Sequence, residues 1–457
     1  MIKGSKKNFV KILFIILTTF LFSGCIGIVT PEELLQKPKI EPYTVEIKNA
    51  VDTYMPTNGK LAIPYESKGG SSVNLVDLDG DDKEEVIVFY EAMKEYYQIG
   101  AFVLKDVDGY FEVSNYIQGD GIFLLDASFV DLTGDKNPEL LMGWYNGKNK
   151  YKTLDIYTFK NDNLRKIDTI NYTSFEIGDL DNDLKNELYS IKVNKEENEA
   201  LVEQYKLDDE LNLIKTSYIN TNSFVDNVSK SEIANMTKNK KALFIDYDVA
   251  NSGYTNIITY ENGMLKTVFN DITERIEEIQ TFQTYPLGSI DIDDDGIMEI
   301  GIPKPITVYS NENLRNKVFI RVWYEYNGGL NPKAEYYIDF EQEYKILLPQ
   351  FLYGKFTIET KERNFYHETK FRYTGKDVNH NKELFTLAKV NKDRAEEVRN
   401  IFIKEGRTYD VLGRNSRYVF FKLNPNLNEY KYRAFKESHE NLLKRIDLKD
   451  KFEILKD

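Results

Sequence analysis

The sequence repeats one short acidic segment five times, and this repeat constrains the fold more than any other feature. The copies begin at Asp77, Asp131, Asp179, Asn235 and Asp291, so successive copies lie 54, 48, 56 and 56 residues apart. A period of about fifty residues is typical of propeller blades and exceeds that of most helical solenoids. The stretches between the copies are β-rich and are separated by turn residues, which predicts about four strands in each period. We therefore expect an all-β propeller of about five four-stranded blades.

Four of the five copies carry oxygen-bearing side chains at positions 1, 3, 5 and 9 of a turn between two apolar runs. The carboxylates at these positions are Asp77, Asp79, Asp81 and Glu85 in the first copy, Asp131, Asp135 and Glu139 in the second, Asp179, Asp181, Asp183 and Glu187 in the third, and Asp291, Asp293, Asp295 and Glu299 in the fifth. Alternate residues of a tight turn can direct their carboxylates at one cation, and Ca²⁺ accepts about six to eight oxygens without rigid geometry. The sequence therefore predicts structural Ca²⁺ in these loops.

The loops are expected to differ in their affinity for Ca²⁺. Thr133 supplies a neutral oxygen at position 3 of the second copy, so this loop is expected to bind more weakly. The fourth copy is expected to be a turn without metal, because it has only Asn235, Thr237, Asn239 and Leu243 at the four positions. An EF-hand is excluded, because strands flank the loop and its last acid comes too early. The alternative for every copy is a hairpin in which the Asp side chains accept backbone N–H groups and hold no ion.

The Asp-x-Asp-x-Asp turn between two short apolar strands, repeated at blade spacing over about 60 to 340, resembles the FG-GAP or VCBS-type repeats. These repeats build the propellers of integrin α-chains and of many secreted bacterial proteins. The resemblance implies a calcium-stabilised propeller whose loops lie between the first two strands of each blade. This chain departs from the family in having Glu at position 9, where many members have Asp, and in lacking a Phe-Gly/Gly-Ala-Pro signature.

The amino terminus has the layout of an export signal. Four lysines precede the apolar run Ile12–Phe22, which is followed by Ser23, Gly24 and the single cysteine, Cys25. The alternative is a transmembrane anchor, but 11 residues are too few to cross about 30 Å of hydrocarbon. The segment Leu21–Cys25 resembles the lipobox of bacterial lipoproteins, with Phe22 where that family usually has Leu. This resemblance implies a diacylglycerol on Cys25 and a chain tethered to the extracytoplasmic face of the cell membrane.

The acidic turn stops recurring after Glu299, and helix-like patterns arrive after Asn391. We therefore divide the chain into a lipoprotein signal peptide (1–24), a tether (25–45), the propeller (46–343) and a small α+β domain (344–457). A sixth blade would be present if 43–66 contributed strands. In the α+β domain, one helix is predicted over 393–404 behind a capping Asn391, and another from Asn424 to about Ile446.

Composition excludes several function classes. The formal net charge of −14 argues against a nucleic-acid partner, and the single cysteine and three histidines argue against disulfides and thiolate zinc sites. No nucleophile elbow, Walker loop or dinucleotide fingerprint is present, so no catalytic residue is predicted. Two functions remain open at this point. The first is a cell-surface binding or scaffolding module for an unknown protein or glycan ligand, and the alternative is a secreted enzyme that acts on polysaccharide or peptidoglycan at a propeller mouth.

Overall fold

The computed structural model describes residues 42–455 except 67–69, 94–96, 148, 222–223, 270–274, 285, 307–318, 340, 376–381 and 428–432. The predicted signal peptide, Cys25 and nearly all of the predicted tether lie outside the described residues. Among the described residues, no helix is both long and apolar enough to cross a membrane.

Five antiparallel sheets follow one another along the chain, and in each the four strands of the blade pair in sequence order. The first blade contains β2 (Val73–Val76), β3 (Glu85–Met93), β4 (Tyr97–Val107) and β5 (Tyr110–Gln118), and the second contains β6 (Phe123–Val130), β7 (Glu139–Tyr145), β8 (Lys152–Lys160) and β9 (Asn163–Tyr172). The third contains β10 (Ser174–Gly178), β11 (Glu187–Asn194), β12 (Glu199–Leu207) and β13 (Leu213–Asn220), and the fourth contains β14 (Asn227–Thr237), β15 (Lys240–Val249), β16 (Ser252–Glu261) and β17 (Met264–Thr267). The fifth contains β18 (Ser289–Ile290), β19 (Glu299–Pro305), β20 (Phe319–Tyr326) and β21 (Leu330–Asp339). The expected class, an all-β propeller-type array of five blades followed by a small α+β unit, is therefore confirmed.

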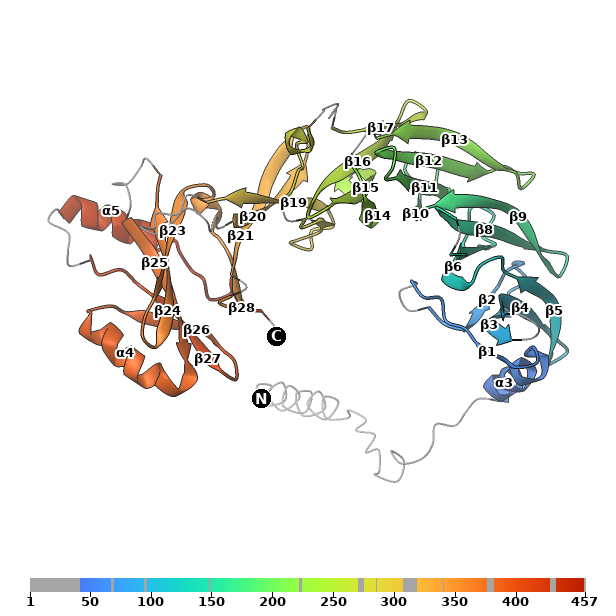
Figure 1. Cartoon of the computed structure of the whole chain (residues 1–457), viewed down its shortest axis with the longest axis horizontal. Coiled ribbons are helices and arrows are strands. Elements are labelled where there is room, and N and C mark those ends of the chain that lie inside the picture. The colour runs from blue at the N-terminus through green and yellow to red at the C-terminus, as the bar shows by residue number, and fades with distance from the viewer. Residues whose placement is uncertain are drawn as a thin grey trace, which may run out of the picture.

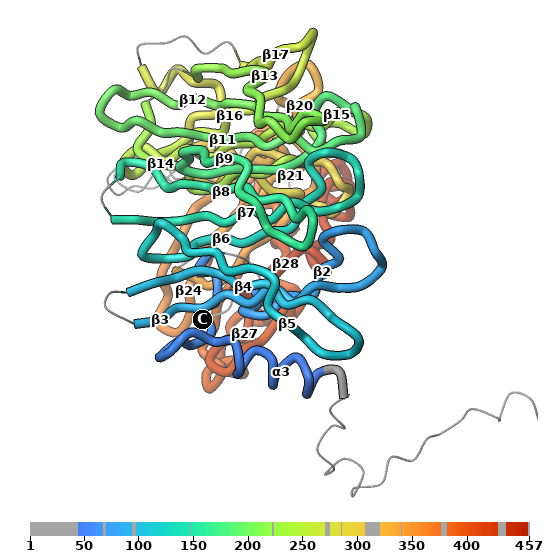
Figure 2. The backbone as a smooth tube through the Cα atoms, turned by 90° about the vertical axis from the view of Figure 1, so that its right-hand side faces the viewer, coloured from blue at the N-terminus to red at the C-terminus, as the bar shows by residue number. Residues whose placement is uncertain are grey.

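The blades are arranged along an open arc rather than a closed ring (Figure 1). Strands β6, β10 and β14 lie toward the inner side of the arc, and β9, β13 and β17 lie toward the outer side (Figure 1). Figure 2, viewed from the right-hand side of Figure 1, shows the blades stacked one on the next. The first blade and the α+β unit therefore lie at the two ends of the arc.

The stacking follows from the apolar residues of the inner strands. Successive side chains of a strand point to opposite faces, so a strand between two packed layers must be apolar on both. In β3, Ile87 and Phe89 pack toward the second blade, whereas Val86 and Val88 pack on the opposite face. This explains why the strands read as continuous apolar runs instead of alternating ones.

A helix covers the free face of the first blade, opposite the second blade. It begins before residue 45, where we expected the tether to end. Helix α3 (Pro42–Tyr54) buries Ile47, Ala50 and Val51 against that blade. Its apolar residues recur at helical spacing, and proline is favoured in the first turn of a helix. The rest of 43–66 adds no sixth blade, because β1 (Gly59–Leu61) pairs with β3 of the first sheet.

The sheet of the fifth blade continues past residue 343, where we expected the domain boundary. Strand β22 (Tyr344–Leu347) pairs with β21, and β28 (Phe452–Ile454), near the carboxyl end of the chain, pairs with β22. The α+β unit has a sheet of order β23-β24-β25-β27-β26, made of β23 (Phe356–Glu362), β24 (Tyr366–Tyr373), β25 (Lys382–Asn391), β26 (Tyr409–Arg414) and β27 (Tyr418–Leu423). Its helices are α4 (Ala395–Lys404) and α5 (Arg433–Leu443). The 3₁₀ turns are η1 (Ile276–Glu278), which lies between the fourth and fifth blades, η2 (Gln350–Leu352) and η3 (Lys392–Arg394).

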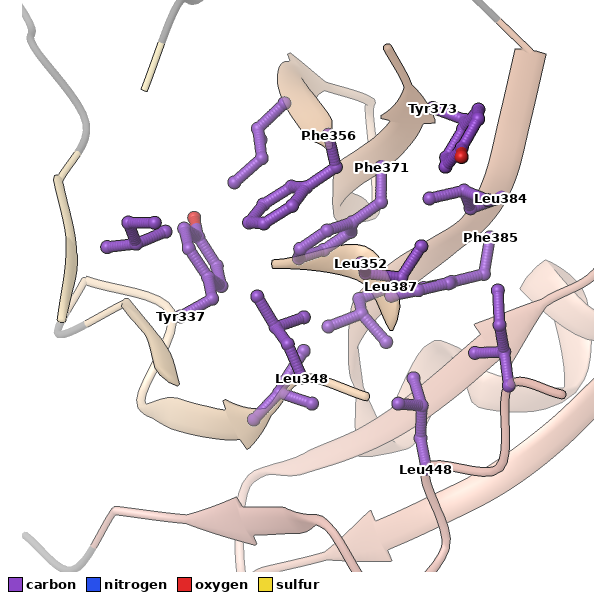
Figure 3. Close-up of a cluster of buried hydrophobic side chains, with 14 of the residues drawn as sticks. Tyr337, Leu348, Leu352, Phe356, Phe371, Tyr373, Leu384, Phe385, Leu387 and Leu448 are labelled. Atoms are coloured by element: carbon purple, nitrogen blue, oxygen red, sulfur yellow. The ribbon is translucent and has the colours of Figure 1, made fainter. Parts of the chain in front are cut away.

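One apolar core joins the fifth blade to the α+β unit. Tyr337 of β21 packs edge-on against Phe371 of β24, with ring centroids 5.2 Å apart, and Phe371 stacks on Phe385 of β25 (Figure 3). The expected division between 343 and 344 therefore cuts through a sheet and a shared core.

The expected helix caps are also corrected. Asn391 ends β25 and its side chain caps no helix, because η3 lies between it and α4. The segment at Asn424 is not helical, and the described part of α5 begins at Arg433.

Candidate functional site

The four acidic loops lie between the first two strands of their blades, at β2–β3, β6–β7, β10–β11 and β18–β19. The aspartate at position 1 organises each turn by accepting backbone N–H groups. Asp77 accepts from Gly80 at 2.7 Å and from Asp82 at 3.0 Å, and Asp179 accepts from Asn182 at 2.6 Å and from Leu184 at 3.0 Å. This part of each loop is an Asx-type turn that needs no ion to form.

The glutamate at position 9 is buried in all four loops. In each, its Oε2 accepts the backbone N–H of the residue at position 2, at 2.9 to 3.1 Å. Burial raises the pKa of Glu85, Glu139 and Glu299 to about 7, and it also raises the pKa of Glu187. A buried carboxylate of this kind requires a proton or a cation nearby.

Three loops bring their carboxylates together as a metal site would. The oxygens of Asp179, Asp181, Asp183 and Glu187 lie within 4.8 Å of one another, as do those of Asp77, Asp79 and Glu85, and those of Asp291, Asp293 and Asp295. Asp81 and Glu299 stand outside these groups, and the second loop (Asp131, Asp135 and Glu139) forms no such group among the described residues. In the fifth loop, Oε1 of Glu299 is buried and has no hydrogen-bond partner in the described part of the chain. The donor set of hard oxygens therefore fits Ca²⁺ in the third loop, and less completely in the first and fifth.

A lysine from a later strand of the same blade reaches each of these three loops. Lys105 of β4, Lys206 of β12 and Lys333 of β21 form ion pairs with the loop carboxylates. These lysines are not apparent from the sequence, because only the pairing of the strands brings them near the loops. The one sequence feature that could have pointed to them is a lysine within a strand that follows an acidic loop.

The fourth copy is a tight hairpin between β14 and β15. Asn235 and Thr237 lie within β14, and Leu243 is buried in β15. The Nδ2 of Asn235 donates to the Gly296 carbonyl in the fifth loop at 2.9 Å. This copy therefore contributes a contact between blades instead of a cluster of carboxylates.

A second candidate site is a pocket of about 470 Å³ between the second and third blades. It is lined from β6 by Asp126 and Ser128, and from β10 by Ser174, Phe175 and Glu176. Strands β6 and β10, which supply these residues, lie toward the inner side of the arc (Figure 1).

The remaining walls of the pocket come from three further segments. Lys152 begins β8, Tyr172 ends β9, and Glu66 lies on a segment whose backbone N–H donates to the Leu125 carbonyl of β6 at 2.7 Å. Lys152 Nζ donates to both oxygens of Glu66, at 2.8 and 2.9 Å, and lies 5.7 Å from the centre of the Tyr172 ring. Five separate segments therefore converge on this pocket.

Two polar groups in the pocket have no partner among the described residues. They are the hydroxyls of Tyr172, which is 2% exposed, and of Ser128. Glu176 accepts a hydrogen bond from Ser231 at 2.6 Å, yet burial raises its pKa to about 7. This site is not apparent from the sequence. The one feature that could have indicated it is Glu176, a glutamate between Phe175 and Ile177 in a strand.

Two exposed aromatic residues are close in sequence to residues that line the pocket. Tyr65, 84% exposed, precedes Glu66, and its backbone N–H donates to the Leu124 carbonyl at 3.0 Å. Phe123, at the start of β6, stacks on Tyr145 with ring centroids 6.4 Å apart.

No family model and no curated protein matches this chain. Among solved structures, it is similar to the exotype rhamnogalacturonan lyase YesX, with 11% identity and a TM-score of 0.28 over 69% of this chain and 61% of that chain. It is also similar to a putative 6-phosphogluconolactonase from Bacteroides uniformis, with 10% identity and a TM-score of 0.31 over 70% of this chain and 93% of that one. The chain thus spans less than two thirds of the YesX lyase. At these low TM-scores, the propeller-type assignment depends on the strand pairing of the chain itself.

Proposed function

We propose that this protein is a lipid-anchored, extracytoplasmic binding module of the FG-GAP/VCBS type, and that its ligand is a neutral or amino-bearing glycan. The pocket between the second and third blades carries the proposal. It combines carboxyl groups and unpartnered hydroxyls with the rings of Tyr172 and Phe175, and such groups can hydrogen-bond and stack on a polar ligand. Calcium in the acidic loops would have a structural role.

The charge of the pocket selects among glycans. Glu66, Asp126 and Glu176 supply three carboxyl groups, whereas Lys152 is the one basic residue of the described lining and is already paired with Glu66. Carboxylates accept hydrogen bonds from hydroxyl and ammonium groups and repel other carboxylates. Anionic polysaccharides are therefore disfavoured as ligands of this pocket.

Calorimetric titration with three oligosaccharides tests this proposal. Cello-oligosaccharides and chitosan oligosaccharides represent the neutral and amino classes, and oligogalacturonate represents the anionic class. Binding of at least one of the first two is expected, together with a loss of about tenfold in affinity in Glu176→Gln, because a charged acceptor is replaced by a neutral one.

The matched comparison uses two exposed tyrosines. Tyr65→Ala should weaken binding of the longer oligosaccharides, whereas Tyr110→Ala, at a tyrosine 75% exposed at the start of β5, should not. Binding of oligogalacturonate alone, or equal affinities in the wild type and Glu176→Gln, would count against the pocket.

The membrane anchor is the second part of the proposal. It is supported by the apolar run that ends in Ser23-Gly24-Cys25, with the cysteine being the only one in the chain. Radiolabelled fatty acid should enter the wild-type protein and not Cys25→Ser. Equal labelling of both proteins would exclude this anchor.

A second candidate function is hydrolysis of a polysaccharide at the same pocket. The observation that favours it is Glu176, whose pKa of about 7 would allow the side chain to donate a proton near neutral pH. Asp126, which lines the same pocket, would be the second carboxylate. Release of reducing ends by the wild type, lost in Glu176→Gln while binding remains, would support the enzyme over the binding module.

A further inference from the structure

We propose that Lys105, Lys206 and Lys333 are internal cations that take the place of calcium in the first, third and fifth loops. Calcium would then enter these loops only by displacing an ammonium group. This inference rests on the proposed calcium sites. It adds that a lysine of the same chain competes with Ca²⁺ for the loop carboxylates.

The third loop shows the arrangement most fully. Lys206 Nζ lies 2.6 Å from Asp181 Oδ2, 2.6 Å from Asp183 Oδ2 and 3.2 Å from Glu187 Oε1. These three carboxylates belong to the group whose oxygens converge as metal ligands. The ammonium group therefore pairs with three of the four carboxylates that would coordinate the ion, so the lysine and the ion would compete for them.

In the first and fifth loops, a lysine also pairs with the loop carboxylates, but with fewer of them at short distance. Lys105 Nζ lies 2.9 Å from Asp79 Oδ2 and 2.5 Å from Asp162 Oδ1 in the β8–β9 hairpin of the next blade. Lys333 Nζ lies 2.5 Å from Asp295 Oδ2 and 3.5 Å from Asp293 Oδ2. In each loop, at least one carboxylate of the convergent group is paired with a lysine.

The lysines reach the loops from non-equivalent places. In the first and third blades, Lys105 and Lys206 follow Leu104 and Tyr205, which pair with Val86 and Leu188, the residues after Glu85 and Glu187. In the fifth blade, Glu325 follows Tyr324, the partner of Ile300, and Lys333 instead comes from a bulge in β21. A lysine therefore reaches the loop from a different strand position in the fifth blade than in the first and third. This indicates that the clustered carboxylates require a neighbouring cation, since like charges close together repel strongly.

The second loop differs in this respect. Thr158 follows Tyr157 of β8, the partner of Leu140, and no lysine pairs with Asp131, Asp135 or Glu139 in the part of the chain that the structure describes. No lysine would therefore compete with a cation at this loop, but its carboxylates do not converge as those of the other three acidic loops do. The expected weaker Ca²⁺ binding of the second loop remains a prediction.

The experiment compares Lys206→Met with the wild type in the full chain. With chelator, the variant should melt at a lower temperature, because its loop carboxylates have lost their cation. With Ca²⁺, titration calorimetry should show one site with an affinity about tenfold higher than in the wild type, since a competing unit charge is gone. Lys192→Met is the matched control, because Lys192 pairs with Glu203 in the same blade and touches no loop. It should change the melting temperature without changing the Ca²⁺ affinity.

The outcomes separate this inference from the calcium proposal itself. Ca²⁺ binding of equal strength in the wild type and Lys206→Met would overturn the inference and leave calcium in place. Absence of Ca²⁺ binding in both proteins would overturn both. If Lys206→Met does not fold, Lys105→Met provides the same comparison at the first loop.

Discussion

The residues at position 9 of the acidic loops explain why a cation matters to this protein. Glu85, Glu139, Glu187 and Glu299 are fully buried, and each accepts a backbone N–H with one oxygen only. Isolated buried carboxylates are costly unless they are paired or protonated. A lysine or a calcium ion in the loop would meet this requirement.

Calcium is expected to raise the melting temperature, and removing one ligand should reduce that rise. An ion at about 100 times its dissociation constant adds about 2.7 kcal/mol of stability per site when it does not bind the unfolded chain. Asp181→Ala should lose part of this increment, because its carboxylate belongs to the third group. The measurement is the melting temperature with millimolar Ca²⁺ and with chelator, and Mg²⁺ should substitute poorly because it demands a tighter shell.

A substitution in the fourth copy of the repeat is the control for the Ca²⁺-dependent rise in melting temperature. Asn235→Ala should lower the melting temperature equally with and without Ca²⁺, because it removes the hydrogen bond to the Gly296 carbonyl and no metal ligand. No effect of Ca²⁺ beyond that of a matched ionic strength would mean that all the loops are Asx-type hairpins.

Glu176 should make stability depend on pH. Its pKa is about 7 in the folded state against an ordinary value of 4.5, so between these values the folded chain binds more protons than the unfolded chain. Stability therefore falls as pH rises through this window. Glu176→Gln should consequently melt above the wild type at pH 8 and close to it near pH 4.5.

The groups around Glu176 limit the size of this effect. Asp126 and Glu232 raise its pKa, and Lys230 and the Ser231 hydrogen bond lower it. A difference between Glu176→Gln and the wild type that does not change with pH would show that Glu176 is ionised throughout.

At the scale of elements, helix α3 and strand β28 are additions to the repeat. Helix α3 covers the free face of the first blade, where a preceding blade would pack in a closed ring. Strand β28 extends the sheet of the fifth blade through β22. Both elements cover a surface that the open arc would otherwise expose.

Packing of α3 should contribute measurably to stability. Ile47→Ala should lower the free energy of unfolding by about 2 kcal/mol, because it leaves a cavity between α3 and the first blade. Val45→Ala, at a residue 42% exposed, is the control and should change it by less than about 0.5 kcal/mol. Urea denaturation would measure both, and equal effects would show that α3 does not pack on the blade.

At the scale of the whole molecule, the fifth blade and the α+β unit share one core. Phe371→Ala should therefore destabilise both, by about 3 kcal/mol, through lost contacts with Tyr337 and Phe385. Hydrogen exchange should accelerate in β20 and β21 as well as in β24 and β25. Faster exchange confined to β24 and β25, or a stable proteolytic fragment ending near 343, would instead support two independent domains.

The sequence alone determined the repeat, the blades and the acidic turns. These features are local, because the apolar runs of the strands and the turn residues between them lie within a single strand–turn–strand segment. Five blades of about four strands therefore followed from spacing and pattern, whereas the place of the loops between the first two strands was implied by the resemblance to FG-GAP or VCBS-type repeats. The loss of carboxylates in the fourth copy was equally visible, since Asn235, Thr237 and Asn239 are read directly.

Only the tertiary structure decided which distant residues meet. Lys206 reaches the third loop because β12 pairs with β11 in one register, and a shift of one residue would turn the lysine to the other face. The pocket forms only because residues of β6 and β10 line it together. The sheet of the fifth blade is completed only because β28, from the end of the chain, pairs with β22. Such pairings depend on the packing of whole sheets, so the pattern within any one segment does not specify them.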